Sequence, residues 1–207
     1  MKLQDHTVPD IRRAKQQLRK TILGRLSGMT AAGRTTQSKA LVDALQGLPE
    51  IDRAVSVMAF WPMKLEPDLS TLLDRLVARG VQVALPFITR SEPASVAGGP
   101  RMVARPYQSA DALVTNHWGI REPTGLEIRP DSLDIILIPA VAISRTGDRL
   151  GHGRAYYDEY LLTATSARLI APVFREQLVD WLPVEGHDRP VDLIITPDEV
   201  IRTKSRA

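Results

Sequence analysis

The chain contains no cysteine among its 207 residues. This absence excludes disulfides, thiolate nucleophiles and cysteine-based zinc or iron–sulfur sites together. Aromatic residues make up only 5% of the chain, and no basic run is interleaved with them, so a surface that stacks single-stranded nucleic acid finds little support. Long apolar runs are also missing, since segments such as residues 135–138 and 193–195 have the length of a strand and cannot span a bilayer.

The excess of positive charge is small, because 27 lysines and arginines face 24 aspartates and glutamates for a formal net charge of +3. Such a balance does not imply a nucleic-acid partner and suits a small anionic ligand equally well. The N-terminus carries Asp5, Asp10 and several basic residues without an apolar segment, so it does not resemble a signal peptide. We therefore expect a cytoplasmic protein without a nucleic-acid or membrane partner, and a monomer rather than an obligate oligomer.

Two helices are expected at the start of the chain. Apolar residues recur at helical spacing from Ile11 to Leu26, which predicts the first helix. Thr30 is a candidate N-cap for the second helix, whose apolar stripe ends before Gly47. No strand pattern precedes them.

The rest of the sequence alternates between strand and helix patterns. Short apolar runs predict strands over residues 54–60, 81–87, 102–107, 134–139, 169–174 and 193–196, and helical patterns cover residues 69–78 and 156–162. Such a pattern is typical of an α/β fold with three layers, in which helices cover both faces of a mostly parallel sheet. The length fits one domain over residues 1–207.

A basic loop with three glycines follows the apolar run at residues 134–139. In open α/β sheets the ligand crevice lies beyond the carboxyl ends of the strands, which is where this loop belongs. Its glycines allow close backbone approach, Arg149 and Arg154 supply positive charge, and the helix start behind it offers free N–H groups to an anion. A phosphate group is a natural ligand for such a loop.

Spacing alone leaves a second interpretation open, in which the glycines only form a turn and the tyrosines only pack in the core. Two common nucleotide motifs are missing. The loop has no Gly-x-x-x-x-Gly-Lys sequence followed by Ser or Thr, and Tyr156 stands where a dinucleotide fingerprint would need a third glycine.

A resemblance to a known family tells more about this loop than its residue spacing does. Residues 149–158, Arg-Leu-Gly-His-Gly-Arg-Ala-Tyr-Tyr-Asp, resemble the R-L-G-x-G-x-G-Y-Y-D loop of the 5-formyltetrahydrofolate cyclo-ligase family, with Ala155 in place of the third glycine. Four more segments are similar to the family's motifs and follow in the family's order: Lys15-Gln-Gln-Leu-Arg19, Glu66-Pro-Asp68, Gly119-Ile-Arg-Glu-Pro123 and His187-Asp-Arg-Pro-Val-Asp192.

The resemblance implies an ATP-dependent ligase that closes 5-formyltetrahydrofolate, a reduced folate of one-carbon metabolism, to 5,10-methenyltetrahydrofolate and releases ADP and phosphate. An amide oxygen is a poor leaving group, so the implied reaction first transfers the γ-phosphoryl group of ATP to the formyl oxygen. Positioning and charge neutralisation dominate phosphoryl transfer, which favours basic residues and a divalent metal in the site.

The resemblance also implies roles for individual residues. The residues expected to bind ATP are Lys15, Arg19, Arg149, Leu150, Gly151, His152, Gly153, Arg154, Ala155, Tyr156 and Tyr157. Catalysis is expected of Arg149, Arg154 and Tyr156, and the folate is expected to contact Trp61, Glu66, His152 and Tyr156. Asp158 and Asp188 match the carboxylates that would hold Mg²⁺, which takes one or two carboxylates together with phosphate oxygens and water.

Each role has a structural alternative that the residues alone leave open. Lys15 and Arg19 lie four residues apart and could be a solvated helix face, Trp61 could be a core residue, and Asp158 could cap a helix. His6 and His117 are expected to be incidental, and His187 receives no catalytic role.

Three functional hypotheses therefore stand: the active cyclo-ligase, a divergent paralogue that binds ATP but acts on another substrate, and a non-catalytic folate-binding protein. Ala155 motivates the second hypothesis. If its backbone has a positive φ, its methyl group costs about 1 kcal/mol or more, whereas ordinary dihedral angles would make the alanine harmless.

Overall fold

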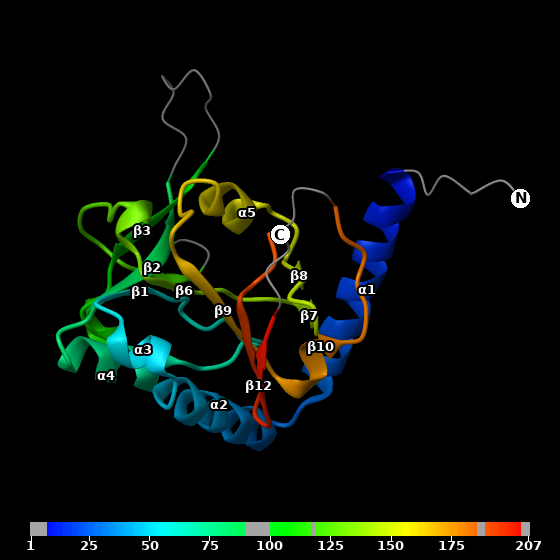
Figure 1. The fold of residues 1–207 in the computed structure, drawn as a ribbon, viewed down its shortest axis with the longest axis horizontal. Helices are drawn as coiled ribbons and strands as arrows, with labels where there is room; N and C mark the ends of the chain where they lie inside the picture. Colours follow the sequence, from blue (N-terminus) through cyan, green and yellow to red (C-terminus); the bar gives the residue numbers. More distant parts are fainter. Residues whose placement is uncertain (1–7, 90–99, 117–118, 186–188, 204–207) are drawn as a thin grey trace, which may run out of the picture.

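A mostly parallel seven-stranded sheet forms the centre of the computed structural model, which describes residues 8–89, 100–116, 119–185 and 189–203 (Figure 1). The strand order is β12-β11-β9-β6-β1-β2-β3. The five inner strands run parallel, while β12 and β3 pair antiparallel with β11 and β2 at the two edges. The strands are β1 Ser56–Met58, β2 Gln82–Ile88, β3 Met102–Pro106, β6 Ile135–Leu137, β9 Arg168–Pro172, β11 Leu193–Ile195 and β12 Val200–Arg202.

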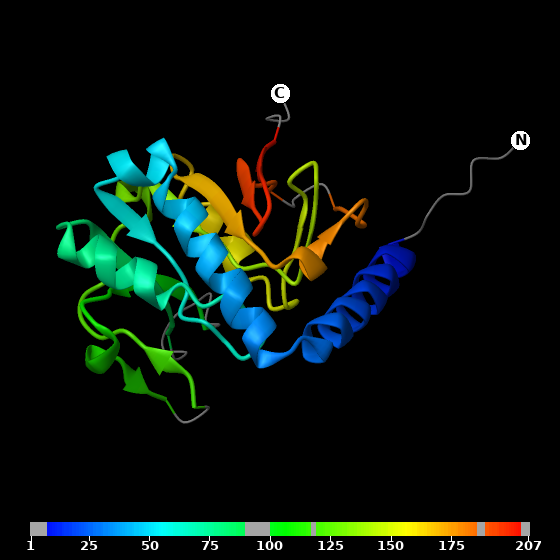
Figure 2. The same ribbon diagram turned by 90° about the horizontal axis from the view of Figure 1, so that it is seen from below.

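Helices lie on both faces of this sheet. They are α1 Val8–Gly28, α2 Ala31–Gln46, α3 Pro49–Arg53, α4 Ser70–Ala78 and α5 Tyr156–Leu161. Because successive strand residues point to opposite faces, Val57 packs in the core cluster that contains the apolar residues of α1 to α4, and Met58 packs in the cluster that contains those of α5. Figures 1 and 2 show α5 across the sheet from α2, α3 and α4, which gives three layers.

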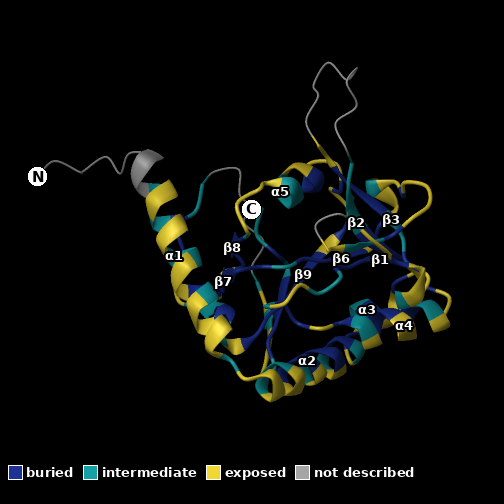
Figure 3. Ribbon diagram, turned by 180° about the vertical axis from the view of Figure 1, so that it is seen from behind, coloured by how far each residue is buried: buried dark blue, intermediate teal, exposed yellow. Residues whose placement is uncertain are grey.

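Burial follows this layering. The sheet strands are mostly buried, and the helices turn their exposed residues outward (Figure 3). The hydroxyl of Thr30 accepts a hydrogen bond from the N–H of Gly33 at 3.0 Å, so this residue is the N-cap of α2. No helix in the described ranges is both long enough and apolar enough to cross a membrane.

Two small sheets extend the main one. The first has the order β10-β7-β8, and the second pairs β4 with β5. Their strands are β4 Val114–Thr115, β5 Arg121–Glu122, β7 Ala142–Ser144, β8 Arg149–Leu150 and β10 Leu178–Val179, and short 3-10 turns occupy Ala110–Ala112, Pro130–Ser132 and Arg175–Gln177.

The fold confirms the predicted α/β architecture and its two N-terminal helices. A further short helix, α3, begins at Pro49 and precedes β1. The chain runs from β1 to its neighbour β2 on one side and later returns to β6 on the other side of β1. This reversal is the topological switch point, where the carboxyl ends of adjacent parallel strands leave a crevice between diverging connections.

Candidate functional site

A cavity of about 420 Å³, here called the main cavity, opens at this switch point. Phe60 and Trp61 follow the end of β1, Pro86 and Ile88 lie in the second half of β2, and Pro139 follows β6. The carboxyl ends of three neighbouring parallel strands therefore form its floor. The volume lies within the range of about 300–1,000 Å³ that is usual for cavities that bind small molecules.

The structure brings the described residues of the predicted site together in this one cavity. Those that line it are Lys15, Arg19, Trp61, Glu66, Arg149, Leu150, Gly151, His152, Gly153, Arg154, Ala155, Tyr156, Tyr157 and Asp158. They come from α1, the segment after β1, and the loop between β8 and α5. Asp188, predicted as a metal ligand, lies outside the described residues, as do His6, His117 and His187. The roles of the gathered residues remain predictions.

Arg149 is a buried cation in the wall of the main cavity. It lies in β8, and one of its Nη atoms donates to Oδ1 of Asp158 at the start of α5. Its Nε is buried and has no hydrogen-bond partner in the described part of the chain. A buried guanidinium with an unused donor retains capacity to bind an anionic ligand.

The loop glycines let a second arginine come close to the backbone. Nε of Arg19 in α1 donates to the carbonyl oxygen of Gly151 at 2.8 Å. Gly153 has a φ of +91°, and a Cβ at that position would lie 3.3 Å from the guanidinium carbon of Arg19. A side chain at Gly153 would therefore crowd this arginine as well as strain the backbone.

Lys15 lies one helical turn before Arg19 and is 7% exposed. Its ammonium group forms an ion pair with Oε2 of Glu185 at 2.8 Å. The two basic residues that resemble the family's N-terminal motif are thus oriented toward the main cavity by polar contacts, and they are not a solvated helix face.

Glu66 is a buried carboxylate of the main cavity in the segment after β1, 9% exposed. Its Oε2 accepts a hydrogen bond from the N–H of Met63 at 3.0 Å, and its Oε1 lies 3.4 Å from Nε2 of His152. The backbone bond fixes the carboxylate, because Met63 and Glu66 are also joined by a bond from the N–H of Glu66 to the carbonyl oxygen of Met63 at 3.0 Å.

Trp61 is held between two side chains. The guanidinium carbon of Arg121 lies 5.0 Å from the centroid of its indole ring, which is a cation–π geometry. On another side the ring of Tyr107 lies at a centroid distance of 6.0 Å, and the Tyr107 hydroxyl donates to Asp74 at 2.7 Å. Burial raises the pKa of this hydroxyl, and the hydrogen bond to the Asp74 carboxylate raises it further, so it stays a donor.

The helix that follows the glycine loop is short. α5 contains six residues and begins directly after the loop. Ala155 occupies its N-cap position with φ 57° and ψ 3°, the left-handed conformation. It is the only residue other than glycine with a positive φ in the described ranges, so the alanine that replaces the family's third glycine carries backbone strain.

The Tyr157 hydroxyl is buried in the main cavity and has no hydrogen-bond partner among the residues that the structure describes. Burial raises the pKa of this hydroxyl, the nearby carboxylate of Glu66 raises it further, and Arg149 opposes the shift. The hydroxyl is therefore a neutral donor available to a ligand.

Sequence reasoning missed several residues that line the main cavity, among them Met63, Arg121 and Glu122. Arg121 and Glu122 belong to a segment that resembles the family, which is the signal that could have identified them. The pairing of Arg121 with Trp61 depends on the β4–β5 hairpin, whose strands of two residues leave no periodic pattern.

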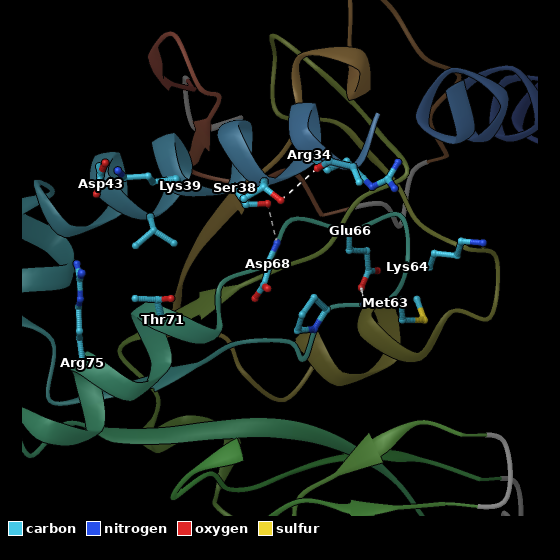
Figure 4. A pocket seen from close by; sticks show the side chains of 14 residues that line it. Arg34, Ser38, Lys39, Asp43, Met63, Lys64, Glu66, Asp68, Thr71 and Arg75 are labelled. Atoms are coloured by element: carbon cyan, nitrogen blue, oxygen red, sulfur yellow. Dashed lines mark hydrogen bonds between the residues drawn. The ribbon is translucent and has the colours of Figure 1, made fainter. Parts of the chain in front are cut away.

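A further cavity, of about 660 Å³, lies between α2 and the start of α4 and shares Met63 and Glu66 with the main cavity. Figure 4 shows side chains of both helices facing it, including Lys39 and Arg75. Four basic and three acidic side chains line it, so its charge favours no class of ligand. No group of three or more His, Asp or Glu side chains suited to a metal ion occurs in residues 8–89, 100–116, 119–185 and 189–203.

The fold and the main cavity together define the class of the protein. It is an α/β protein with a cavity of small-molecule size at the carboxyl edge of its parallel strands, lined by buried cations and carboxylates.

Within that class, the chain belongs to the 5-formyltetrahydrofolate cyclo-ligase family, whose model matches residues 11–197. A 5-formyltetrahydrofolate cyclo-ligase of Mycolicibacterium smegmatis is 34% identical over 189 residues, which cover 89% of this chain and 94% of the relative. The cyclo-ligase of Mus musculus is 26% identical, with coverage of 89% and 94%. The NMR structure of Aquifex aeolicus 5,10-methenyltetrahydrofolate synthetase superposes with a TM-score of 0.78 at 27% identity, covering 93% of this chain and 94% of that one. The protein is therefore a member of a ligase family, as the five sequence segments indicate.

Proposed function

We propose that this protein catalyses the ATP-dependent cyclisation of 5-formyltetrahydrofolate to 5,10-methenyltetrahydrofolate, with release of ADP and phosphate. The observation that carries the proposal is that the main cavity gathers the described residues predicted to bind ATP and folate. Relatives with this activity in their names match most of the chain. A cavity that receives the reacting ends of both substrates allows a group to pass directly from one to the other.

The chemical step follows from the poor leaving group on the formyl carbon. The formyl oxygen attacks the γ-phosphorus of ATP, and the bond to the bridging oxygen breaks so that ADP leaves. The neighbouring folate nitrogen then attacks the formyl carbon, the carbon–oxygen bond breaks, and phosphate departs with the proton of that nitrogen. Arg149 and Arg154 would neutralise charge on the transferred group, and Lys15 and Arg19 would orient the phosphate chain.

The side chains of the segment after β1 suit the folate. Glu66 would accept hydrogen bonds from the amino and ring N–H groups of the pterin, because a carboxylate fixed by the backbone is a paired acceptor. Trp61, held by Arg121 and Tyr107, offers a rigid ring for stacking. His152, 3.4 Å from Glu66, and Tyr156 would lie between the two substrates.

Magnesium fits the donors that the site offers. Asp158 supplies a carboxylate in the main cavity with one oxygen on Arg149, and Mg²⁺ is usually bound by one or two carboxylates plus phosphate oxygens and water. When bound, the ion would neutralise phosphate charge and help to orient the phosphate chain. We propose Asp158 and Asp188 as its protein ligands.

The test is an absorbance assay for 5,10-methenyltetrahydrofolate formed from 5-formyltetrahydrofolate and MgATP. We expect product only when ATP is present. Arg154→Ala should raise the KM for ATP about tenfold or more and change the KM for folate much less, because a hydrogen bond to a charged group contributes about 1.5–3 kcal/mol. Arg145→Ala is the matched control, since Arg145 is paired with Glu199 and does not line the main cavity.

The second candidate function is a divergent paralogue that binds ATP but acts on another substrate. Its specific support is Ala155, whose left-handed backbone at the cavity wall carries a methyl group where the family has glycine. ATP binding without methenyl product would favour this candidate. Folate binding with neither ATP binding nor product would favour a non-catalytic folate-binding protein.

The proposal also includes a single domain over residues 1–207, a monomer and residence in the cytoplasm. Light scattering coupled to size-exclusion chromatography tests the monomer, and a mass twice that of the chain would overturn it.

A further inference from the structure

A hollow of about 720 Å³ lies next to the main cavity, beside strands β2 and β3. We call it the Arg105 hollow. It is lined by Phe87, Ile88, Thr89, Pro100, Arg105, Val114, Thr115, Asn116, Glu122, Pro123, Thr124, Arg154 and Tyr156. Four of these residues, Ile88, Glu122, Arg154 and Tyr156, also line the main cavity. The two spaces therefore adjoin at these four residues, where an extended ligand would reach from one into the other.

The size of the main cavity makes such an extension necessary for the proposed reaction. Its volume of about 420 Å³ is near the lower end of the range of about 300–1,000 Å³ in which single drug-sized ligands bind. The reaction requires two co-substrates of at least that size at the same time. Part of one of them must therefore lie outside the main cavity.

Arg105 gives the hollow a cation whose position is already fixed. Its guanidinium carbon lies 3.5 Å from the centroid of the Phe87 ring, a cation–π contact. Its Nε is buried without a hydrogen-bond partner, and it forms no ion pair with the residues that the structure describes. By contrast, Arg101, directly before β3, is paired with Glu127 at 2.9 Å.

An arginine in this state suits one kind of ligand group. Its planar set of donors matches a carboxylate or a phosphate in a two-pronged hydrogen bond. Because Arg105 already stacks on Phe87, its side chain loses less conformational entropy when a ligand binds. The binding free energy is therefore more favourable. The charged side chains that line the hollow are Arg105, Arg154 and Glu122, so two cations face one carboxylate.

We propose that the Arg105 hollow binds the carboxylate-bearing tail of the folate substrate, and that Arg105 pairs with a carboxylate of its glutamate. This inference rests on the proposed function, and it adds a subsite and a specificity-determining residue. A folate carries its p-aminobenzoyl-glutamate group at the end remote from the cavity that would hold the pterin. We place the pterin at Glu66 and Trp61 and the tail at Arg105, past the four residues that line both spaces.

A phosphate group of ATP offers the same chemistry to a guanidinium, so the experiment must separate the two sources. The steady-state KM values for 5-formyltetrahydrofolate, for the analogue 5-formyltetrahydropteroate, which lacks the glutamate, and for ATP are measured. They are compared between the unmodified protein, Arg105→Gln and the matched control Arg101→Gln, which removes an exposed charge outside the hollow.

The unmodified protein and Arg101→Gln should discriminate against the analogue by about tenfold or more in KM, as expected for loss of a charge-assisted hydrogen bond of about 1.5 kcal/mol or more. In Arg105→Gln the ratio of the KM for the analogue to the KM for 5-formyltetrahydrofolate should fall to within about twofold of one. The KM for ATP should stay unchanged. Arg105→Lys should keep part of the discrimination because the charge remains. A ratio that persists in Arg105→Gln overturns the proposal, and a rise in the KM for ATP instead assigns the hollow to the nucleotide.

Calorimetric binding of tetrahydrofolate and tetrahydropteroate separates this proposal from the proposed function. If the protein forms no methenyl product but binds tetrahydrofolate more tightly through Arg105, the subsite is supported and the proposed reaction fails. If product forms but both ligands bind equally in the unmodified protein and in Arg105→Gln, the subsite fails alone. Circular dichroism and thermal unfolding show whether Arg105→Gln is misfolded. If it is, Arg105→Lys replaces it in the test: retained discrimination against the ligand without glutamate supports the subsite, and equal binding of both ligands contradicts it.

Discussion

At the scale of single residues, Ala155 has the conformation that least suits its side chain. Its φ of 57° places an L-residue in the left-handed region, at a cost of about 1–2 kcal/mol relative to ordinary backbone. The methyl group is exposed, so it gains little packing in return. We expect Ala155→Gly to raise the free energy of unfolding by about 1 kcal/mol, measured by urea denaturation.

The kinetics of Ala155→Gly help to distinguish an active cyclo-ligase from a divergent paralogue that acts on another substrate. If the methyl group at residue 155 keeps nucleotide out, Ala155→Gly should lower the KM for ATP as well as stabilise the protein. A gain in stability with an unchanged KM would show that the alanine is tolerated by the nucleotide site. A loss of stability would contradict the backbone argument itself.

The buried hydroxyl of Tyr157 supports a second prediction at this scale. It has no partner in the described ranges, so Tyr157→Phe should leave the free energy of unfolding unchanged or raise it by up to about 1 kcal/mol. If the hydroxyl donates to a substrate, kcat/KM should fall about three- to tenfold. Tyr160→Phe is the matched control, because that hydroxyl is also buried and without a partner but does not line the main cavity.

Equal kinetics in Tyr157→Phe and Tyr160→Phe would remove Tyr157 from ligand binding. A marked loss of stability in Tyr157→Phe would show instead that the hydroxyl has a structural partner.

At the scale of elements, the β7–β8 hairpin determines where Arg149 lies. Gly147 forms its turn with a φ of +92°, and a Cβ there would lie 2.7 Å from the carbonyl oxygen of Val191 and 2.9 Å from Cγ2 of Thr203. Gly80, with a φ of +81°, has no atom within 4 Å of such a Cβ. An alanine at residue 80 would therefore meet backbone strain alone, whereas an alanine at residue 147 would meet backbone strain and steric overlap.

Gly80→Ala should lower the free energy of unfolding by about 1 kcal/mol through its backbone alone. Gly147→Ala should lower it by about 1–3 kcal/mol more, because the extra methyl group must displace backbone atoms of a packed strand connection. It should also reduce turnover by moving Arg149. Equal destabilisation of the two variants in urea titrations would contradict the steric part of this prediction.

The elements that sequence analysis located are those whose pattern is local. The strand β6 lies within the uninterrupted apolar run of residues 135–138, and Thr30 and Gly47 mark the ends of α2 as predicted. The strands β4, β5, β8 and β10 contain two residues each, too few for a periodic pattern. They form because distant segments pair with them, and a single sequence does not contain that information in local form.

At the scale of the whole molecule, ionised carboxylates contribute to stability. Asp134 joins β1 to β6, since its carboxylate accepts hydrogen bonds from the N–H groups of Val55 and Ser56 at 2.9 Å and 3.0 Å. Burial opposes its ionisation, but these bonds outweigh burial and lower its pKa. At Glu50, a hydrogen bond from Arg202 lowers the pKa against the opposing effect of burial.

A carboxyl group whose pKa is lower in the folded state stabilises the protein above its unfolded pKa and loses that contribution as the pH falls through the folded pKa. The free energy of unfolding should therefore decrease below about pH 4, the ordinary range of these groups. Asp134→Asn should make this decrease shallower in urea titrations from pH 6 to pH 3. A slope identical to that of the unmodified protein would exclude Asp134 from the effect.

The candidate site could be located from the sequence because its residues belong to segments that resemble the family's motifs. The fold then gathers segments as distant as Lys15 and Asp158 around one cavity. The positive φ of Ala155 could not be predicted from the family motifs or from residue spacing. The same holds for the Arg105 guanidinium, whose Nε has no hydrogen-bond partner in the described ranges. Both depend on packing between elements, which residue type does not determine.

In the reaction that we propose, the formyl oxygen accepts the γ-phosphoryl group of ATP before the ring closes. The most direct measurement uses 5-formyltetrahydrofolate labelled with ¹⁸O in the formyl group, with MgATP and unlabelled water, and mass spectrometry of the released phosphate. We expect one methenyl product and one ADP per turnover, with the label in the phosphate. Product formed with unlabelled phosphate, or no methenyl product at all, would contradict the proposed reaction.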